Sequence, residues 1–485
     1  MPKLNGFIGG SSVSVSPEQD CERTMNFYVE PGPRSGKNSG ALYPMPGFLS
    51  WTTVSQVGAR ALYEMNGTML GVLGGTQYSF ASLGTATSLG SVTQDSNQAQ
   101  IVSNGAVGAQ FLTASGTNGY CYTPSSGAFT QVLTGDCVMV GMLDGYGIAL
   151  NPLTSRIRLS NLNDFTTWSS TQFAARGDAP DNWVAMVVNI PDVWLIGQQT
   201  GVVFYDAGTF PFPLAPRPGA TFKYGIVAPW TLKTAGGYVL WLSRNAEGAG
   251  IVVQAVGYSP QRVSTYEVET AIAGYARNFS ITDAESLMFQ YQGHTFYVLT
   301  FPSANATWMM DVTTGIWTEL GKWNSPMTRY DIWQPRVHCY AFGQHIVGDR
   351  ATGQLSLMDG AYQSEADGSL IRRMRITPAV FNENRQIPHR RLEVMLEHGL
   401  GTQTGQGVNP LLTVEYSDDG GKTYSPPLTM AAGNVGEYPK RTYLTRLGVP
   451  RNRVYRFVMT DPVPWRLLDC YINNDGPQQQ AGRAA

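Results

Sequence analysis

One eight-residue segment near the C-terminus combines residue types that could take part in chemistry. It reads Ser417-Asp418-Asp419-Gly420-Gly421-Lys422-Thr423-Tyr424 and follows the pattern S-x-D-x-G-x-T-[WY], which is called an Asp box. In a tight hairpin, Gly421 would supply a positive φ, Asp419 would accept backbone N–H groups, and Tyr424 would anchor the next strand. We therefore interpret this segment as a structural turn, built by Ser417, Asp419, Gly421, Thr423 and Tyr424.

An Asp box also invites an enzymatic interpretation, because sialidases carry it in their propellers, although there it is a turn remote from the active site. Hydrolysis of that type needs an arginine cluster for the substrate carboxylate, a tyrosine nucleophile and an acid. The Arg-Ile-Pro segment of such enzymes is absent, and Arg375-Ile376-Thr377-Pro378 comes closest without matching. We predict a chain without enzymatic activity or catalytic residues, and a sialidase-like glycoside hydrolase remains one alternative.

Other signatures of catalysis or of cofactor binding are missing from the sequence. The five histidines show no H-x-x-x-H spacing, and there is neither a P-loop nor a G-x-S-x-G motif. The five cysteines are far apart and include no C-x-x-C pair, which favours free thiols over structural zinc or disulfides. We predict no cofactor and no bound metal. The absence of a signal peptide and of an 18-residue apolar run predicts no export and no membrane span.

Basic residues gather in the C-terminal part of a chain whose net charge is only −2. Residues 1–370 have 18 Lys or Arg against 25 Asp or Glu, whereas residues 371–470 have 14 against 9. Three interpretations are open for the second group: a face for an acidic partner protein, a lining along a DNA channel, or a solvated face with ion pairs to Glu393, Glu397 and Glu415. The candidate interface or channel residues are Arg372, Arg373, Arg375, Arg390, Arg391, Arg451 and Arg453.

The middle of the chain, from about residue 42 to 365, has the texture of short strands joined by tight turns. Apolar and aromatic runs alternate with Gly, Asn, Asp or Ser, and Asn66-Gly67 between two such runs is a strong hairpin signal. Short apolar strands that end in Asp recur at 201–208, 306–312 and 353–360. Such repeats predict the four-stranded blades of a β-propeller, and about 45 residues per blade gives roughly six to eight blades. A tandem β-sandwich is the alternative.

The two ends of the chain differ from this middle part. Residues 1–41 are rich in Gly, Ser and Pro, which predicts an extended arm that packs on a neighbouring subunit. Period-two alternation predicts a β-sandwich over residues 366–475, and residues 476–485 are predicted to be a disordered tail. The fold class is therefore all-β: an N-terminal extended arm, a β-propeller over residues 42–365 and a C-terminal β-sandwich.

Several segments together resemble a family of proteins from short-tailed phages, the podovirus tail hub proteins, also called packaged DNA stabilisation or head-completion proteins. The resemblance rests on the order and spacing of these segments over nearly the whole chain. They are residues 22–28, 41–47, 257–265, 296–302, 347–350 with Gly353, the Asp box, 436–438, 446–448 and 461–463, with Lys37 near the start.

This resemblance implies a structural protein of the virion tail that is made in the host cell cytoplasm. Such proteins form a ring, usually a homo-hexamer, below the portal adaptor, and they close the DNA exit channel so that packaged DNA is retained. The implied partners are other copies of the chain, the portal adaptor, a tail needle or plug, and tail fibres or spikes, with double-stranded DNA passing through the channel. A receptor- or glycan-binding tail protein is the other alternative.

Overall fold

A computed structural model describes residues 3–33, 40–105, 109–177, 179–210, 212–245, 248 and 250–473. The chain forms two compact units, each built from separate stretches of sequence. Unit 1 comprises Met1–Gly47, Thr314–Tyr330 and Gly360–Ala485, and unit 2 comprises Phe48–Thr313 and Asp331–Asp359. The tail predicted for residues 476–485 lies outside the described residues. Within the described part of the chain, no helix has the length and apolar character needed to cross a membrane.

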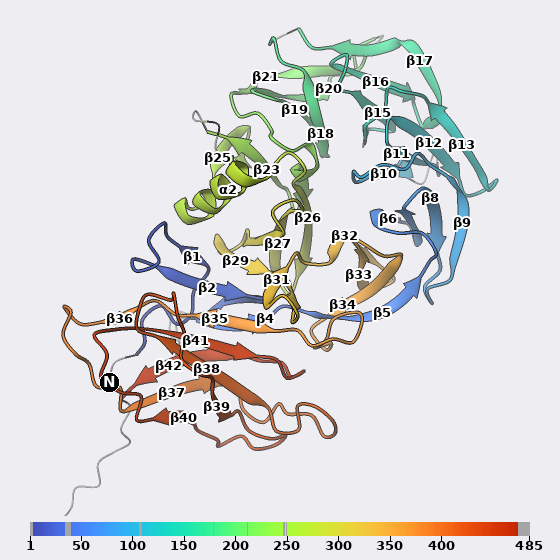
Figure 1. The fold of residues 1–485 in the computed structure, drawn as a ribbon. Coiled ribbons are helices and arrows are strands. Elements are labelled where there is room, and N and C mark those ends of the chain that lie inside the picture. Colours follow the sequence, from blue (N-terminus) through green and yellow to red (C-terminus); the bar gives the residue numbers. More distant parts are fainter. Residues whose placement is uncertain are drawn as a thin grey trace, which may run out of the picture. The chain divides into compact units, whose positions relative to one another are not determined.

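Unit 2 is a β-propeller, and its described residues form seven sheets that follow one another around a common centre (Figure 1). The first three sheets contain β6 (Ala59–Met65), β7 (Thr68–Leu73), β8 (Thr76–Phe80) and β9 (Ala86–Ser91); β10 (Gln100–Ser103), β11 (Phe111–Ser115), β12 (Asn118–Thr123) and β13 (Ala128–Leu133); and β14 (Met139–Leu143), β15 (Tyr146–Asn151), β16 (Arg156–Asn161) and β17 (Asp164–Ala175).

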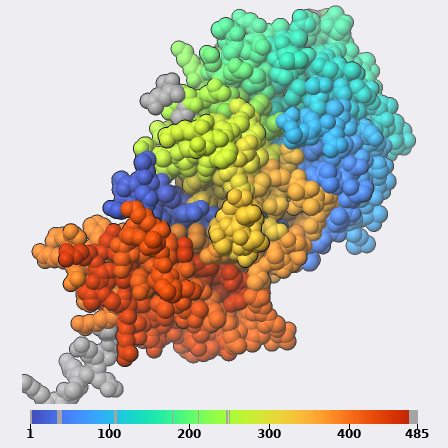
Figure 2. Space-filling model, viewed as in Figure 1, coloured from blue at the N-terminus to red at the C-terminus, as the bar shows by residue number. Residues whose placement is uncertain are grey.

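The remaining sheets of unit 2 repeat the antiparallel order. They contain β18 (Trp183–Asn189), β19 (Asp192–Gly197), β20 (Gly201–Asp206) and β21 (Leu214–Phe222); β22 (Lys233–Ala235), β23 (Tyr238–Arg244), β24 (Gly250–Val256) and β25 (Ser259–Arg262); β26 (Glu285–Tyr291), β27 (His294–Phe301) and β28 (Ala306–Asp311); and β32 (Pro335–Ala341), β33 (Gln344–Asp349), β34 (Gln354–Asp359) and β5 (Gly47–Thr53). A 3-10 turn, η1 (Pro229–Thr231), and one helix, α2 (Tyr266–Asn278), flank β22–β25. The space-filling view shows the same succession as a progression of colour over unit 2 (Figure 2).

Two-residue turns ending in glycine join the first and second strands of most of these sheets. Asn66-Gly67, Asp144-Gly145, Gln292-Gly293 and Phe342-Gly343 all have both φ angles between +49° and +87°. Two consecutive positive φ values define the type I′ turn, whose twist matches that of the strands it connects. Gly236-Gly237, with φ of +59° and +83°, occupies the same position between β22 and β23. The hairpin is therefore the repeating unit from which the propeller is built.

The propeller closes because a strand from the start of the chain completes its last sheet. β5 is the outer strand beside β34, although more than 300 residues separate the two in sequence. The loop after β5 follows the same path, since Val54 N–H donates to the Gly353 carbonyl at 2.9 Å. A Cβ atom on Gly353 would lie 2.1 Å from the Gln56 carbonyl oxygen, so glycine is required for this approach. With β5 added, this last sheet has four strands like most of the others, and the ring of sheets is closed.

Unit 1 is a β-sandwich that takes strands from both ends of the chain. One sheet has the order β3 (Phe27–Pro31), β4 (Gly40–Pro44), β42 (Leu467–Ile472), β37 (Arg391–Leu396) and β40 (Thr442–Thr445). The other has, within unit 1, β29 (Ile316–Leu320), β2 (Cys21–Met25), β35 (Arg373–Ile376), β41 (Asn452–Met459), β38 (Leu411–Ser417) and β39 (Leu428–Ala431), with β1 (Ser12–Val13) on β2 and β36 (Val380–Phe381) on β41. A separate pair joins β30 (Lys322–Asn324) to β31 (Arg329–Asp331).

The core of unit 1 lies between these sheets and includes the first residues of the chain. Leu4 and Phe7 are buried, and Phe7 packs edge-on against Phe457 with ring centroids 5.4 Å apart. The same core contains Phe27 and Leu42 from β3 and β4. In this structure the described residues among the first 41, for which the composition predicts an extended arm, thus supply strands and apolar side chains to the sandwich of their own chain.

Candidate functional site

The Asp box forms the connection after β38, and its side chains bind the backbone of the turn itself. Asp419 accepts the N–H groups of Lys422 and Thr423 at 3.0 and 2.9 Å, and the Ser417 and Thr423 hydroxyls donate to its two carboxylate oxygens at 2.6 Å. These hydrogen bonds, first of all that from Ser417, hold the pKa of Asp419 well below its ordinary value. Gly421 has a φ of +87°, and the Ser417 hydroxyl accepts its N–H at 2.8 Å.

Tyr424 closes the Asp box by packing against an arginine of the neighbouring strand. The Arg456 guanidinium lies 3.6 Å from the centre of the Tyr424 ring and donates to Glu415 at 2.6 Å. Burial raises the pKa of Tyr424 to about 12, which disfavours the phenolate that a nucleophile requires. Ser417, Asp419, Gly421 and Thr423 therefore bind one another within the turn, and Tyr424 packs beside it.

Arg375, one of the candidate interface residues, is entirely buried and binds the N-terminal segment. Its guanidinium donates to the carbonyl groups of Phe7 and Gly10 and to the Thr24 hydroxyl, each at 2.8 Å, and also to the Gly6 carbonyl and the Glu22 carboxylate. Burial lowers the pKa of Arg375, an effect that the Glu22 charge opposes. This side chain holds the path of residues 6–10 and contributes nothing to the surface of the chain.

Arg373 and Arg453 are also buried inside unit 1. Arg373 donates to the Gln363 side chain at 2.9 Å, and burial lowers its pKa to about 10. Arg453 makes a two-pronged ion pair with Asp418 at 2.6 and 2.7 Å and stacks 3.9 Å from the centre of the Tyr416 ring. Both therefore act within the sandwich.

The other four candidate arginines are at least partly exposed, but they do not form one cluster of free cations. Arg372 stacks 3.8 Å from the centre of the Trp323 ring, and Arg391 lies equally far from the Tyr443 ring and 3.4 Å from Glu393. Arg390 and Arg451 are exposed. Ion pairs to the predicted acidic partners are present as Arg441–Glu393, Arg466–Glu397 and Arg456–Glu415. The ion pairs to Glu393, Glu397 and Glu415 are thus formed by other arginines of the C-terminal region, and an interface or a channel lining stays a prediction for the exposed candidates.

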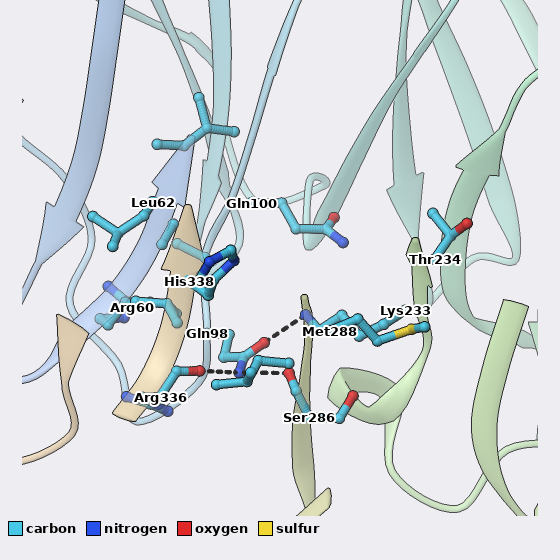
Figure 3. A pocket seen from close by; sticks show the side chains of 15 residues that line it. Arg60, Leu62, Gln98, Gln100, Lys233, Thr234, Ser286, Met288, Arg336 and His338 are labelled. Carbon is cyan, nitrogen blue, oxygen red and sulfur yellow. Dashed lines mark hydrogen bonds between the residues drawn. The ribbon is translucent and has the colours of Figure 1, made fainter. Parts of the chain in front are cut away.

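A polar cavity of about 190 Å³, here called the axial cavity, lies where the first strands of five of the seven sheets of unit 2 approach one another (Figure 3). Its walls come from β6, β22, β26 and β32 and from residues 98–101, which enter and begin β10. The polar and charged side chains of the lining are Arg60, Gln98, Gln100, Lys233, Thr234, Ser286, Arg336 and His338. Among its lining residues there is no Asp, Glu, Tyr or Cys.

Gln98 forms hydrogen bonds to three walls of the axial cavity. Its side-chain amide donates to the Ser286 and Arg336 carbonyl oxygens at 3.2 and 3.3 Å, and its Oε1 accepts from Lys233 Nζ at 2.7 Å (Figure 3). Gln98 itself is only 2% exposed. One buried amide therefore links β22, β26 and β32 to the segment that enters β10.

Sequence reasoning did not identify this cavity, although its charged residues occupy corresponding places in the chain. Arg60, Lys233 and Arg336 are each the first or second residue of an innermost strand. A basic residue at the start of the first strand of a blade was the available signal, but finding it requires the blades to be aligned beforehand. In the described parts of the chain, no group of three His, Cys, Asp or Glu side chains could hold a metal ion.

Comparison with known protein families gives two matches that together cover most of the chain. A family model described as the β-propeller of bacteriophage P22 Gp10 matches residues 23–363, and one described as the β-sandwich of the same protein matches residues 372–475. The predicted fold class, a β-propeller with a C-terminal β-sandwich, is confirmed by these matches. No curated protein sequence matches the chain significantly.

Solved structures resemble this chain only distantly. A virginiamycin B lyase from Staphylococcus aureus is 9% identical, with a TM-score of 0.39 over 64% of this chain and 97% of the lyase chain. A chain of a mitotic checkpoint complex is 10% identical, with a TM-score of 0.41 over 67% and 95% of the two chains. The extracellular domain of BT4673 from B. thetaiotaomicron is 8% identical, with a TM-score of 0.43 over 76% and 45%. Similarities at this level say nothing about activity.

Proposed function

The chain belongs to the family of bacteriophage P22 Gp10, and from this we propose that it is the hub of a short phage tail, assembled as a homo-hexameric ring below the portal adaptor. Membership makes it a structural protein of a phage tail and confirms the resemblance to podovirus tail hub proteins. In the proposed role the ring closes the DNA exit channel with a needle or plug, retains packaged DNA, and offers attachment faces for fibres or spikes. Synthesis in the host cytoplasm is part of the same proposal.

The observation that carries this proposal is that residues 23–363 and 372–475 match, in order, the two parts of one phage tail protein. The test is to image the purified chain by negative-stain electron microscopy, alone and with the portal adaptor of the same phage. We expect a ring with six-fold symmetry that binds the adaptor coaxially. A chain that stays monomeric with the adaptor, or a ring of another symmetry, would contradict the proposal.

Exposed apolar side chains at one end of the propeller support assembly through protein contacts. In an antiparallel sheet, the turns between strands one and two and between strands three and four lie at the same end. Large apolar residues of five such turns are exposed, and Phe210 and Leu83 are 96% and 90% accessible; the others are Leu162, Ile190 and Tyr258. We propose that another protein covers this end of the propeller in the assembly, because charged residues are depleted and apolar ones favoured at interface cores.

This face can be tested separately from the fold. The triple variant Leu83→Lys, Leu162→Lys and Phe210→Lys places charges at three of these turns, and we expect weaker assembly in sedimentation velocity with an unchanged denaturation midpoint. Leu153→Lys is the matched control, because Leu153 is equally exposed but lies in a turn at the opposite end, between β15 and β16. Unchanged assembly of the triple variant, or an equal loss in the control, would argue against this face.

We infer that the sialidase-like alternative does not apply. In a propeller the natural place for a substrate is the axial cavity, and the lining there has neither a carboxylate nor a tyrosine to serve as acid or nucleophile. The carboxylate of Asp419 in the Asp box is hydrogen-bonded to the backbone and side chain of Thr423 in the same turn. Release of a fluorophore from a fluorogenic sialoside would refute this inference, and the intact chain should leave the substrate unchanged.

A further inference from the structure

The axial cavity of the propeller contains one cation without a counter-charge, Lys233. A lysine ammonium has three N–H donors. Gln98 Oε1 accepts one of them at 2.7 Å, and the Trp230 ring lies 6.0 Å from Nζ. Among the described residues no carboxylate forms an ion pair with Lys233, although the residue is partly buried. A partly buried cation with donors to spare is costly unless an anion joins it.

The two arginines of the cavity already have partners, so their donors are largely used. Arg60 donates to the carbonyl groups of Asn97, Gly74 and Thr93 and to the Ser115 hydroxyl, and it pairs with Asp95. Arg336 donates to Glu285 at 2.9 Å and to the Ser96 carbonyl at 2.5 Å. Asp95 and Glu285 are therefore committed to arginines, Glu285 to both Arg336 and Arg350, and neither carboxylate pairs with Lys233.

A neutral donor faces the same space. Gln100 accepts the Val140 N–H with its Oε1 at 2.9 Å, which leaves its side-chain NH2 group to donate. Figure 3 shows Gln100 and Lys233 extending from opposite walls into the cavity. The volume of about 190 Å³ is several times the ~30 Å³ that one water molecule takes in the liquid, so a tetrahedral oxyanion fits.

We propose that the axial cavity of unit 2 is a binding site for a small oxyanion of the phosphate type, held by Lys233 Nζ and the Gln100 amide. Charge-assisted hydrogen bonds from the ammonium supply most of the affinity. Gln98 positions Lys233, because it accepts from Nζ while its amide is fixed by two backbone carbonyls. A bound anion would then join β10 to β22 across the centre of the propeller.

The site has a defined pH dependence. Burial, helped by the nearby positive charge of Arg336, lowers the pKa of Lys233 to about 8. The other charged groups around it, Arg60, Arg336, Asp95 and Glu285, are paired, and burial lowers the pKa of His338 to about 3, so that it is neutral. The ammonium form binds the anion, so the contribution of Lys233 to the affinity is present below about pH 8 and is lost as the pH rises above it, the bound anion shifting this midpoint upward.

The decisive experiment is calorimetric titration of the full chain with inorganic phosphate at constant ionic strength. We expect saturable binding at pH 7, a Kd at least ten-fold weaker for Lys233→Met, and weaker binding of wild type at pH 9.5. Lys223→Met is the control, since Lys223 is an exposed lysine of the same unit outside the cavity. Equal affinity of Lys233→Met and wild type, or no saturable binding by wild type, would overturn the proposal.

Two further measurements distinguish loss of the site from misfolding of the variant, and a free phosphate ion from a DNA backbone. Methyl-labelled lysines of the wild-type chain report their pKa values by NMR, and phosphate should raise the pKa of Lys233 alone. A short DNA duplex offers the same phosphate chemistry in a backbone that is too wide for the cavity, and we expect it to leave bound phosphate in place. Displacement of phosphate by the duplex would overturn the assignment to a free ion.

Discussion

Arg375 shows what buried guanidinium groups contribute in this protein. Its five N–H donors are shared among three backbone carbonyls, a hydroxyl and the Glu22 carboxylate, all from residues 6–24. The rigid fork of arginine suits such a set of acceptors, whereas lysine would reach only some of them. The basic residues that look from the sequence like a surface patch are thus partly an internal scaffold.

Replacing Arg375 tests this role. Arg375→Met removes the cation and leaves the Glu22 carboxylate and several carbonyl groups without their partner, and loss of one member of a buried pair costs about 3–5 kcal/mol. Urea denaturation of the purified chain should show a clearly lower midpoint. Arg390→Met, at an exposed position, is the control and should change the free energy of unfolding by less than about 0.5 kcal/mol. Equal midpoints for the two variants would contradict the scaffold role.

Asp419 carries a second prediction at this scale, one that depends on pH. Its pKa is lowered in the folded chain, so its ionised form stabilises the fold above the unfolded-state value near 3.8, and this contribution is lost as the pH falls. Asp419→Asn should therefore unfold at lower urea than wild type at pH 7, and the gap should narrow below about pH 4. Glu383→Gln, at an exposed position, should show no such gap. A difference in urea midpoint between wild type and Asp419→Asn that stays constant with pH would contradict stabilisation by the Asp419 charge.

The roles of Asp419 and Gly421 could be predicted from the sequence because a turn motif is local. Its geometry depends on residues within a few positions of each other, and Ser417, Asp419 and Thr423 do bind within the turn. The burial of Arg373 and Arg375 could not be predicted in this way. Whether an arginine in a strand faces water or a second layer depends on segments far away in the sequence, here residues 6–45.

At the scale of elements, the propeller repeats a hairpin whose turn is readable in the sequence. Asn66-Gly67 predicts one of these hairpins, and the structure contains four more glycine-ended turns at the same place in other sheets. Asp144-Gly145 carries the same signal, but Gln292-Gly293 and Phe342-Gly343 do not, since their first residues are uncommon at positive φ. Turn residues such as Asn66-Gly67 therefore predict individual hairpins, whereas the number of blades is known only from the structure.

Gly353 makes the closure of the propeller testable. Gly353→Ala places a Cβ atom 2.1 Å from the Gln56 carbonyl and 2.2 Å from that of Val54, so the loop after β5 must move away from β34. Overpacking of this kind costs about 1–3 kcal/mol, and we expect a lower thermal midpoint. Gly177→Ala is the control, because a Cβ atom there meets nothing within 4 Å. An unchanged midpoint for Gly353→Ala would show that β5 does not limit stability.

At the scale of the whole molecule, the order of the sequence differs from the order in space. Unit 1 takes strands from residues 1–47, 314–330 and 360–473, and β2 pairs with β35 although about 350 residues separate them. The C-terminal sandwich is predictable from the sequence because apolar and polar residues alternate regularly there. The Gly- and Ser-rich composition of the first residues gives no signal that Leu4 and Phe7 belong to the core of the same sandwich.

Phe7 therefore offers a test of how the ends of the chain are joined. Phe7→Ala removes a fully buried ring that packs against Phe457, and such a substitution typically costs about 3–5 kcal/mol. Denaturation monitored by tryptophan fluorescence should give a lower midpoint. Phe381→Ala, at a 71% exposed phenylalanine, is the control. If Phe7→Ala were as stable as the control but impaired in assembly, the first residues would act on a neighbouring subunit, as their composition predicts.

The interleaving of unit 1 also has a consequence during synthesis on the ribosome. β4 ends at Pro44, whereas β35, which pairs with β2, begins at Arg373 and β42, which pairs with β4, comes later still. At 5–20 residues per second the nascent chain therefore carries β2 and β4 without these two partners for at least about 15–65 s. During that interval the edges of β2–β4 and the apolar side chains of Phe27 and Leu42 are open to other chains. Slowing translation should lengthen this exposure, and we expect it to lower the yield of soluble protein.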